Sequence, residues 1–378
     1  MKTNINRRSF LKGAGVAGAA AMAAGTLGLA GCAPKGQGEL SSTGEGELIL
    51  DAEKFTNAKW SFEIPPEPID ESEITETVDC EILVIGAGVG GLVTATSAVE
   101  EGADVVLIAS SDGPVSRGGS NAAFNTRLTH ELGMDYTREE IEPIFQDIFA
   151  ANSFRLDQDK WWLVYDESGN AMNWLMDKVE PYGITAVIEN NQQDGGKNWW
   201  DGGPLKTLNV SHSFVAEGAQ AAGASQQIVV EALAEEIQKG GGRIFYNTTA
   251  VQLDRENDNT GRVTGCVAKA DGKYTRYNAS KGVVLATGGY GKDVAFRSAQ
   301  DPRLDETVGC TNFEGATAHG LKVALDAGVM GMQLDQIQCY PYTSPEEDSF
   351  GCAATWIEAE SAYAPTIDPT TGKRFVNE

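Results

Sequence analysis

The clearest chemical pattern in the chain is Gly86-Ala87-Gly88-Val89-Gly90-Gly91, which satisfies G-x-G-x-x-G. Such a run suits a diphosphate, because residues without side chains leave backbone N–H groups bare at the start of a helix, where the helix dipole attracts an anion. Gly86 would permit the tight turn, Gly88 the approach of the diphosphate and Gly91 the close packing of helix on strand. We expect a dinucleotide here; the alternative is a tight turn that binds no nucleotide.

The residues that would hold the nucleotide's ribose depart from the usual pattern. An acid at the end of the second strand normally binds the ribose hydroxyls. This chain has Ala109-Ser110-Ser111 at that point. We expect Ser110 or Ser111 to bind the ribose more weakly, and Asp112 is close enough along the chain to reach back.

A second glycine-rich turn follows, at Arg117-Gly118-Gly119-Ser120-Asn121-Ala122-Ala123. It presents several N–H groups with little side-chain bulk, and so suits a pyrophosphate or the edge of an aromatic ring. The alternative is a plain polar turn.

The elements that must position these turns follow an α/β pattern. A buried strand over 82–85, a helix over 91–101 and a strand over 105–108 form a strand–helix–strand unit. Helices are predicted over 137–182, 223–240 and 316–327, and strands over 243–253, 262–269, 273–278 and 282–285. Three tryptophans at helical spacing, Trp161, Trp162 and Trp174, are expected in the core rather than at a ligand.

The N-terminus has the features of an export signal. Residues 1–31 contain Arg7-Arg8 followed by a run of small residues, which is typical of a twin-arginine signal. Leu29-Ala30-Gly31-Cys32 resembles a bacterial lipobox, so we expect lipidation of Cys32; the alternative is ordinary cleavage. The protein would then lie in the cell envelope, either as a membrane-anchored lipoprotein or in the periplasm.

Composition excludes several classes of protein. The chain has 378 residues, 41% of them hydrophobic, which argues against wholesale disorder. Its net charge of −25 would repel nucleic acid. None of the six cysteines forms C-x-x-C, so no zinc knuckle, thioredoxin motif or haem attachment is expected, and no metal site is predicted.

Three motifs in order carry a family resemblance: the first glycine loop, the Gly-Gly-Ser-Asn turn and Ala286-Thr-Gly-Gly-Tyr-Gly291. From Asp79 to Glu378 the chain resembles the FAD-dependent flavoprotein family of fumarate reductase and succinate dehydrogenase. The resemblance implies FAD as cofactor, held by a Rossmann-like domain with a mainly parallel sheet and a β-rich insert. It also implies a separate cap domain for the substrate.

The resemblance also implies further cofactor contacts. The family's adenine contact falls near Val251, and Thr287, Gly288 and Gly289 line the dinucleotide from the other side. Where the family has Thr-Gly-Asp-Gly by the flavin, this chain has Thr317-Ala318-His319-Gly320, so His319 replaces an acid. His319 either contacts the cofactor differently or caps its helix.

The substrate residues implied by the resemblance also depart from the family. A Gln-x-His-Pro segment reads Gln338-Cys339-Tyr340-Pro341, and Tyr340 carries no positive charge. Glu358 matches a proton-relay glutamate, although a solvated surface acid is the alternative, and Ser361 replaces the relay arginine. The family's catalytic arginine would follow Glu378, so we expect this sequence to be the N-terminal portion of a longer protein.

The expected organisation is a signal peptide over 1–31, an acidic tether over 32–74, an FAD-binding domain over 75–339 and the start of a truncated cap domain over 340–378. A structured N-terminal strand around Trp60 and Phe62 is the alternative to the tether.

The expected activity is hydride transfer from flavin N5 to the C=C of an unsaturated acid or enone, with electrons from a cytochrome, a flavin protein or a quinol-linked donor. The alternatives are a dehydrogenase similar to 3-ketosteroid Δ1-dehydrogenase and a non-catalytic electron-carrying flavoprotein.

Overall fold

A computed structural model describes residues 48–49, 59–116, 121–188, 208, 210–216, 225–302, 304–305, 315–329, 343–344, 355–356, 370–371 and 373. The chain divides into two units, 1–42 and 43–378, and all of these residues lie in the second.

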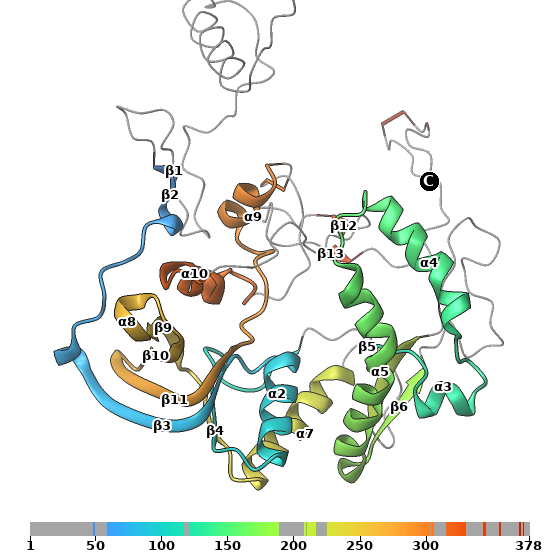
Figure 1. Cartoon of the computed structure of the whole chain (residues 1–378), viewed down its shortest axis with the longest axis horizontal. Coiled ribbons are helices and arrows are strands. Elements are labelled where there is room, and N and C mark those ends of the chain that lie inside the picture. Colours follow the sequence, from blue (N-terminus) through green and yellow to red (C-terminus); the bar gives the residue numbers. More distant parts are fainter. Residues whose placement is uncertain are drawn as a thin grey trace, which may run out of the picture. The chain divides into compact units, whose positions relative to one another are not determined.

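A six-stranded sheet in the order β8-β4-β3-β11-β10-β9 organises this unit (Figure 1). The first four strands run parallel, and β10 and β9 add to the edge as antiparallel strands. The predicted parallel sheet with a β-rich insert is therefore confirmed. The strands are β3 (Ile74–Ile85), β4 (Val105–Ile108), β8 (Arg243–Phe245), β9 (Thr249–Arg255), β10 (Val263–Ala270) and β11 (Lys273–Leu285).

The strand boundaries differ from the prediction in two places. The strands expected over 273–278 and 282–285 form the single long strand β11, which pairs with β3 along its length and shifts register between Ala279 and Gly282. The strand expected over 243–253 is divided into β8 and β9, with Asn247 at a φ of 53° between them. Pairing with β11 also makes β3 begin at Ile74, ahead of the apolar run that signalled it.

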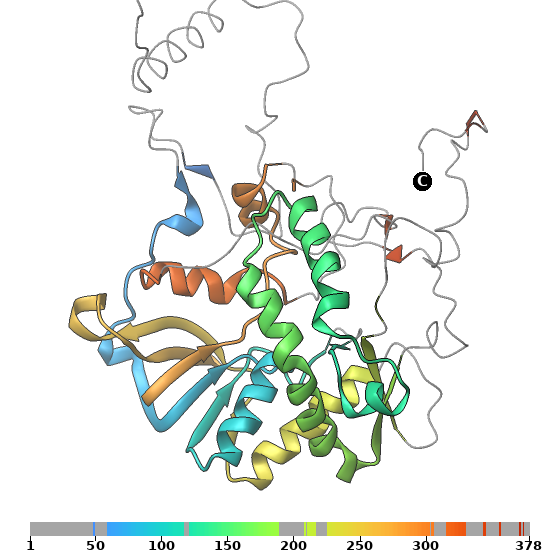
Figure 2. The ribbon, with the colours of Figure 1, turned by 45° about the vertical axis from the view of Figure 1, so that its right-hand side comes forward.

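Adjacent residues of the central strands pack into different cores. Val84 of β3 and Leu107 of β4 face one core with Leu92 and Leu233, all fully buried. Their neighbours, such as Leu83, face a second core because successive side chains of a strand alternate between its faces. The first core is covered by α2 (Val89–Glu100), α5 (Gln158–Val179) and α7 (Ser225–Lys239), which Figure 2 shows grouped together. The second is covered by β9, β10 and α10 (His319–Asp326).

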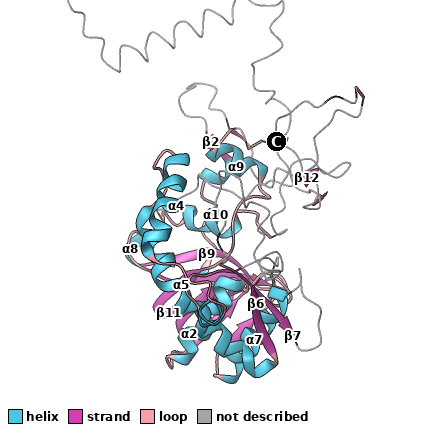
Figure 3. Cartoon of the chain, turned by 90° about the vertical axis from the view of Figure 1, so that its right-hand side faces the viewer, coloured by secondary structure: helices cyan, strands magenta, loops and turns pink. Residues whose placement is uncertain are grey.

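A smaller sheet in the order β5-β7-β6 lies beside α7 (Figure 3). Its strands are β5 (Asn121–Ala122), β6 (Ile184–Ile188) and β7 (Ser211–Ala216). The nearby helices are α3 (Arg127–Glu131), α4 (Arg138–Ala151) and the short η3 (Glu180–Tyr182). Trp161 and Trp162 of α5 pack on Phe145 of α4, with ring centroids 5.3 and 4.9 Å away. Trp161, Trp162 and Trp174 are all partly buried against a hydrophobic core, so the expectation that they belong to a core is confirmed.

The segment before β3 is structured where the structure describes it. Phe62, in η1 (Ser61–Glu63), is only 8% exposed, and its ring lies 4.9 Å from that of Phe296 in α9 (Val294–Gln300). The segment around Trp60 and Phe62 is therefore structured rather than a solvated tether, but only Lys59 and Trp60 form a strand and Phe62 lies in a 3-10 helix. The predicted domain boundaries stay predictions. The remaining short elements are β1 (Leu48–Ile49), β2 (Lys59–Trp60), η2 (Glu71–Glu73), α8 (Glu256–Asn259), β12 (Thr343–Ser344) and β13 (Thr355–Trp356).

Among the residues of known placement, no helix has both the length and the apolar character needed to span a bilayer.

Candidate functional site

A cavity of about 700 Å³ opens where β3, β4 and β11 end. These strands are parallel and in register, with Ile85 paired to both Ile108 and Leu285, so their carboxyl ends form one edge. Open parallel sheets bind their ligands at this edge, and the volume is within the range of ligand sites. The predicted cofactor residues that line the cavity are Gly86, Ala87, Gly88, Ser110, Ser111, Thr287, Gly288, Gly289, His319 and Gly320.

The first glycine loop is packed tightly on one side and open on the other. Gly86 has a φ of 119°, and a Cβ there would lie 2.2 Å from the carbonyl oxygen of Ala286. A Cβ on Gly91 would lie 1.9 Å from the carbonyl oxygen of Gly86. A Cβ on Gly88 would meet nothing within 4 Å, and Gly88 lines the cavity. The first and third glycines are therefore needed for packing, and the second leaves space at the ligand site.

The helix that follows this loop aims its N-terminus at the cavity. Gly88 is the N-cap of α2 and supplies no side-chain cap, and the first bond within the helix runs from the N–H of Leu92 to the Gly88 carbonyl at 2.9 Å. The N–H groups of Val89, Gly90 and Gly91 precede that first bond and have no carbonyl within the helix to bind. With the positive end of the helix dipole, they form a site suited to an anion. Gly90 and Gly91 do not themselves line the cavity.

Two of the predicted ribose residues line the cavity, whereas the predicted adenine contact does not. Ser110 and Ser111 line the cavity, and the Ser111 hydroxyl donates to the Gly113 carbonyl at 2.7 Å. Asp112 does not line it. Thr248, which precedes β9, and Thr249 and Ala250, at its start, also line the cavity. Val251, the residue predicted to contact the adenine, does not.

His319 is the first residue of α10, and its side chain binds a backbone carbonyl of the neighbouring strand β9 rather than capping its own helix. Its Nε2 lies 2.7 Å from the carbonyl oxygen of Ala250, in β9. Because a carbonyl only accepts hydrogen bonds, Nε2 carries the hydrogen. The N-cap of α10 is Ala318, with no side-chain cap, so the capping alternative is wrong. A direct contact of His319 with a cofactor stays a prediction.

Two charged residues at the cavity were missed by the sequence reasoning. Lys322 Nζ lies 2.6 Å from Asp293 Oδ2, and their side chains are 12% and 3% exposed. Asp293 Oδ1 also accepts from the N–H of Phe296, which makes Asp293 the N-cap of α9. Both residues line the cavity. Lys322 could have been found from the sequence, because it lies three residues after His319 and therefore on the same face of the predicted helix.

The second glycine-rich turn is described only at its end. Asn121 and Ala122 form β5 and Ala123 is buried beyond it, and none of them lines the cavity. The Asn121 side-chain amide donates to Gln226 Oε1 at 2.5 Å. The other predicted site residues, Gly118, Gly119, Ser120, Tyr340, Glu358 and Cys32, lie outside the described part of the chain.

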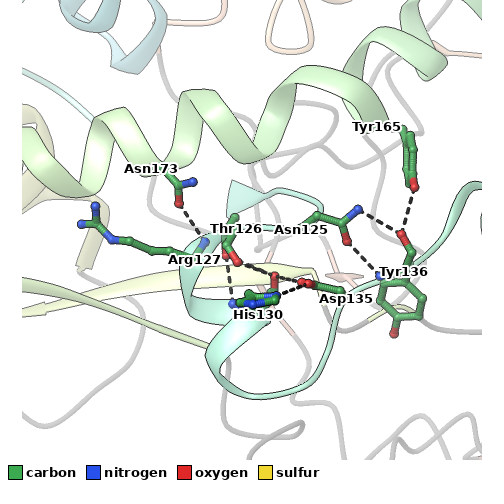
Figure 4. Close-up of polar contacts among 9 residues, drawn as sticks. Asn125, Thr126, Arg127, His130, Asp135, Tyr136, Tyr165 and Asn173 are labelled. Atoms are coloured by element: carbon green, nitrogen blue, oxygen red, sulfur yellow. Dashed lines mark hydrogen bonds and ion pairs between the residues drawn. The ribbon is translucent and has the colours of Figure 1, made fainter.

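A separate polar cluster around α3 is shown in Figure 4. Asp135 accepts from the Thr129 hydroxyl at 2.9 Å and lies 2.8 Å from His130 Nδ1. The buried ring of His212 lies 2.9 Å from the Thr126 hydroxyl. His130 and the Thr129 hydroxyl both bind the Asp135 carboxylate and not one another, so these contacts fix the turn and do not activate the Thr129 hydroxyl. Across the described residues, no group of three His, Cys, Asp or Glu residues is placed to hold a metal ion.

Cys80 and Cys266, the free cysteines among the described residues, are buried in the second core and do not line the cavity. Burial, with the nearby charge of Asp104, raises the pKa of Cys80 from 9.0 to about 11. Burial also raises the pKa of Cys266. Because the thiolate is the reactive form, neither is suited to act as a nucleophile.

Comparison with known proteins gives this geometry a family context. Residues 81–378 match the family described as FAD binding domain, and residues 4–28 match the twin-arginine translocation signal sequence, which directs export. The chain is 27% identical to the acrylate reductase flavoprotein subunit of Shewanella woodyi, over 100% of this chain and 64% of that protein. It is also 27% identical to a fumarate reductase (cytochrome) of Shewanella frigidimarina, over 80% of this chain and 48% of that protein.

The chain thus spans less than two thirds of the length of these relatives. Among solved structures, the fold is similar to a 3-ketosteroid-delta4-(5alpha)-dehydrogenase from Rhodococcus jostii, with a TM-score of 0.56, 23% identity and coverage of 70% of this chain and 57% of that one. It is also similar to a flavocytochrome c3 fumarate reductase, with a TM-score of 0.51, 22% identity and coverage of 68% and 41%. These likenesses show the fold.

The cavity fits FAD, the cofactor that the family match indicates. The diphosphate would lie against the start of α2, where a side chain at Gly88 would take its place. The hydroxyl groups of Ser110, Ser111 and Thr248 lie beside it, and those of Ser111 and Thr248, which donate to backbone carbonyls, can still accept from a ribose hydroxyl. The residues present therefore match the anionic centre and the hydroxyl groups of a dinucleotide.

Proposed function

This chain belongs to the FAD-binding domain family, and we propose that it forms the cofactor-binding part of an exported reductase that acts on the C=C bond of an unsaturated acid or enone. The observation that carries the proposal is the match of the whole chain to an acrylate reductase flavoprotein subunit. Acrylate and fumarate, in the names of the two relatives, are both acids with a C=C bond conjugated to a carboxyl group. The likeness to a steroid dehydrogenase supports the fold alone, and no feature of the cavity favours that reaction.

The cofactor, when bound, supplies hydride chemistry at its flavin ring. The protein's own contribution begins with binding: α2 and the glycine loop hold the diphosphate, so the flavin is fixed at the edge of the sheet. A hydride added to the β-carbon of the substrate must be matched by a proton at the α-carbon. Donors at the substrate's carboxyl or carbonyl group would stabilise the charge that builds up there.

We assign substrate roles to Tyr340 as a hydrogen-bond donor to that carboxyl or carbonyl group and to Glu358 as a proton relay. Tyr340 is uncharged, so a substrate with a single carboxylate or a ketone suits it better than a dicarboxylate. Both assignments rest on the sequence motifs alone.

Electrons would come from an external donor in the cell envelope: a cytochrome, a flavin protein or a quinol-linked protein. The twin-arginine signal is compatible with this, because that route exports proteins already folded around a cofactor. Lipidation of Cys32 would keep the protein at the membrane, near such donors.

The experiment is an anaerobic assay of the whole purified protein, with oxidation of reduced viologen followed for acrylate, fumarate, an aryl acrylate and an enone. The expected result is turnover with at least one, fastest with the monocarboxylates or the enone. A Gly88→Val variant is the matched control and should lose turnover together with bound FAD. No turnover with any of these compounds, from protein that carries FAD, would overturn the proposal.

A further inference from the structure

The cavity contains a buried pair of opposite charges. Of the described residues that line it, Asp293, His319 and Lys322 carry ionisable side chains. Lys322 and Asp293 form an ion pair at 2.6 Å, and both side chains are largely buried. Charges with so little exposure are poorly screened, and therefore act on a bound group more strongly than surface charges do.

Both members of the pair are held in place from outside the cavity. Asp293 is fixed to α9 because its other oxygen accepts from the N–H of Phe296 at 2.8 Å. Lys322 belongs to α10, and its Nζ lies 5.8 Å from the centre of the Phe62 ring. α10 itself is packed close to the end of β11, since a Cβ on Gly320 would lie 2.1 Å from Thr287 Oγ1. The two charges therefore belong to a fixed framework.

The order of the sheet indicates which half of FAD the pair faces. The diphosphate site at α2 follows β3, and the ribose residues Ser110 and Ser111 follow β4, on one side of β3. Asp293 follows β11, on the other side of β3, and Lys322 lies in the helix packed against that strand's end. A dinucleotide held at its centre extends to both sides. With the adenosine toward β4, the flavin half lies on the side of Asp293 and Lys322.

We propose that the Asp293–Lys322 pair sets the reduction potential of the bound FAD by holding two balancing charges beside the flavin half. Reduction adds electrons to the flavin, so a nearby cation favours the reduced form and a nearby anion opposes it. While both charges are present their effects largely cancel. Removing either one leaves the other uncompensated, and the potential then shifts in a direction set by the charge that remains.

The test compares Asp293→Asn and Lys322→Met in the whole FAD-loaded protein, with the potential measured against a reference dye. Asn keeps the N-cap of α9 and Met keeps the length of the side chain. Asp293→Asn should raise the potential and Lys322→Met should lower it. Each shift should change the equilibrium constant for reduction about tenfold or more, which is about 30 mV for two electrons. The double variant should return close to the wild-type value.

The matched control is the pair of Lys178 on α5 and Glu100 on α2, whose side chains are 21% and 45% exposed and which does not line the cavity. Lys178→Met and Glu100→Gln should leave the potential unchanged. FAD content and melting temperature of every variant separate a loss of binding from a change of potential. If Lys322→Met does not retain FAD, Lys322→Gln takes its place.

Shifts of the same sign in both single variants, or shifts no larger than those of the control pair, would overturn the proposal. The measurement needs bound FAD and no organic substrate. If the proposed alkene reduction fails, the measured reduction potentials can therefore still be interpreted, and the two proposals can fail independently.

Discussion

Replacing Gly88 by Val tests whether the glycine loop holds the cofactor. A side chain at Gly88 meets nothing within 4 Å, and its backbone is extended, with φ −80° and ψ 179°, a conformation that valine adopts readily. The cost to the apoprotein is therefore that of a poorer N-cap, about 1 kcal/mol or less. The same side chain would project into the space proposed for the diphosphate.

The expected loss of affinity follows from the N–H groups that the diphosphate would no longer reach. Hydrogen bonds to a charged group contribute about 1.5–3 kcal/mol each. Losing two of them, for example those of Val89 and Gly90, costs about 3–6 kcal/mol. At about 1.4 kcal/mol per tenfold change, FAD should bind roughly 100-fold to 10,000-fold more weakly.

The assay is titration of the deflavinated whole protein with FAD, followed by flavin fluorescence, beside thermal melts of the apoprotein. Gly282→Val is the matched control, since its side chain also meets nothing within 4 Å but lies in β11 away from the cavity lining. The control should bind FAD as the wild type does. FAD affinity of Gly88→Val within about threefold of wild type would refute the placement of the diphosphate, since a real loss is expected to exceed two factors of ten.

Three further predictions follow from the packing. Gly91→Ala should destabilise the fold by about 2 kcal/mol or more in urea unfolding, because the new Cβ would lie 1.9 Å from the Gly86 carbonyl oxygen, and a denaturation midpoint equal to wild type would contradict this. Alkylation of Cys80 in the folded protein should be about 100-fold slower at pH 8 than in the unfolded chain and should accelerate as pH rises toward its pKa of about 11; equal rates at pH 8 would contradict the burial. Phe62→Ala should lower the free energy of unfolding by about 3 kcal/mol, whereas a loss under about 1 kcal/mol would favour a solvated tether.

The parts of the site that depend on local chain geometry could be predicted from the sequence. Gly86, Gly88 and Gly91 are demanded by a turn and by contacts within a few residues of it, so their spacing carries the information. Ser110 was found in the same way, because the end of a short strand after the first helix is easily located.

The parts that depend on distant segments could not be predicted. Asp293 caps α9 and Lys322 lies in α10, 29 residues further along the chain, and no periodicity predicts that the two form a pair. Residues 273–285 were divided into two strands because the middle of β11 is polar, and only pairing with β3 carries the strand through. Similarly, the burial of Phe62 depends on α9, which is more than two hundred residues further along the chain.

The most direct test of the account is the amount of FAD carried by the whole protein when it is purified from cells supplied with riboflavin. Denaturing the protein should release FAD, at close to one molecule per chain, and Gly88→Val protein should release far less. A folded wild-type preparation that is colourless and releases no flavin would contradict the central claim that the cavity at the end of β3 holds FAD.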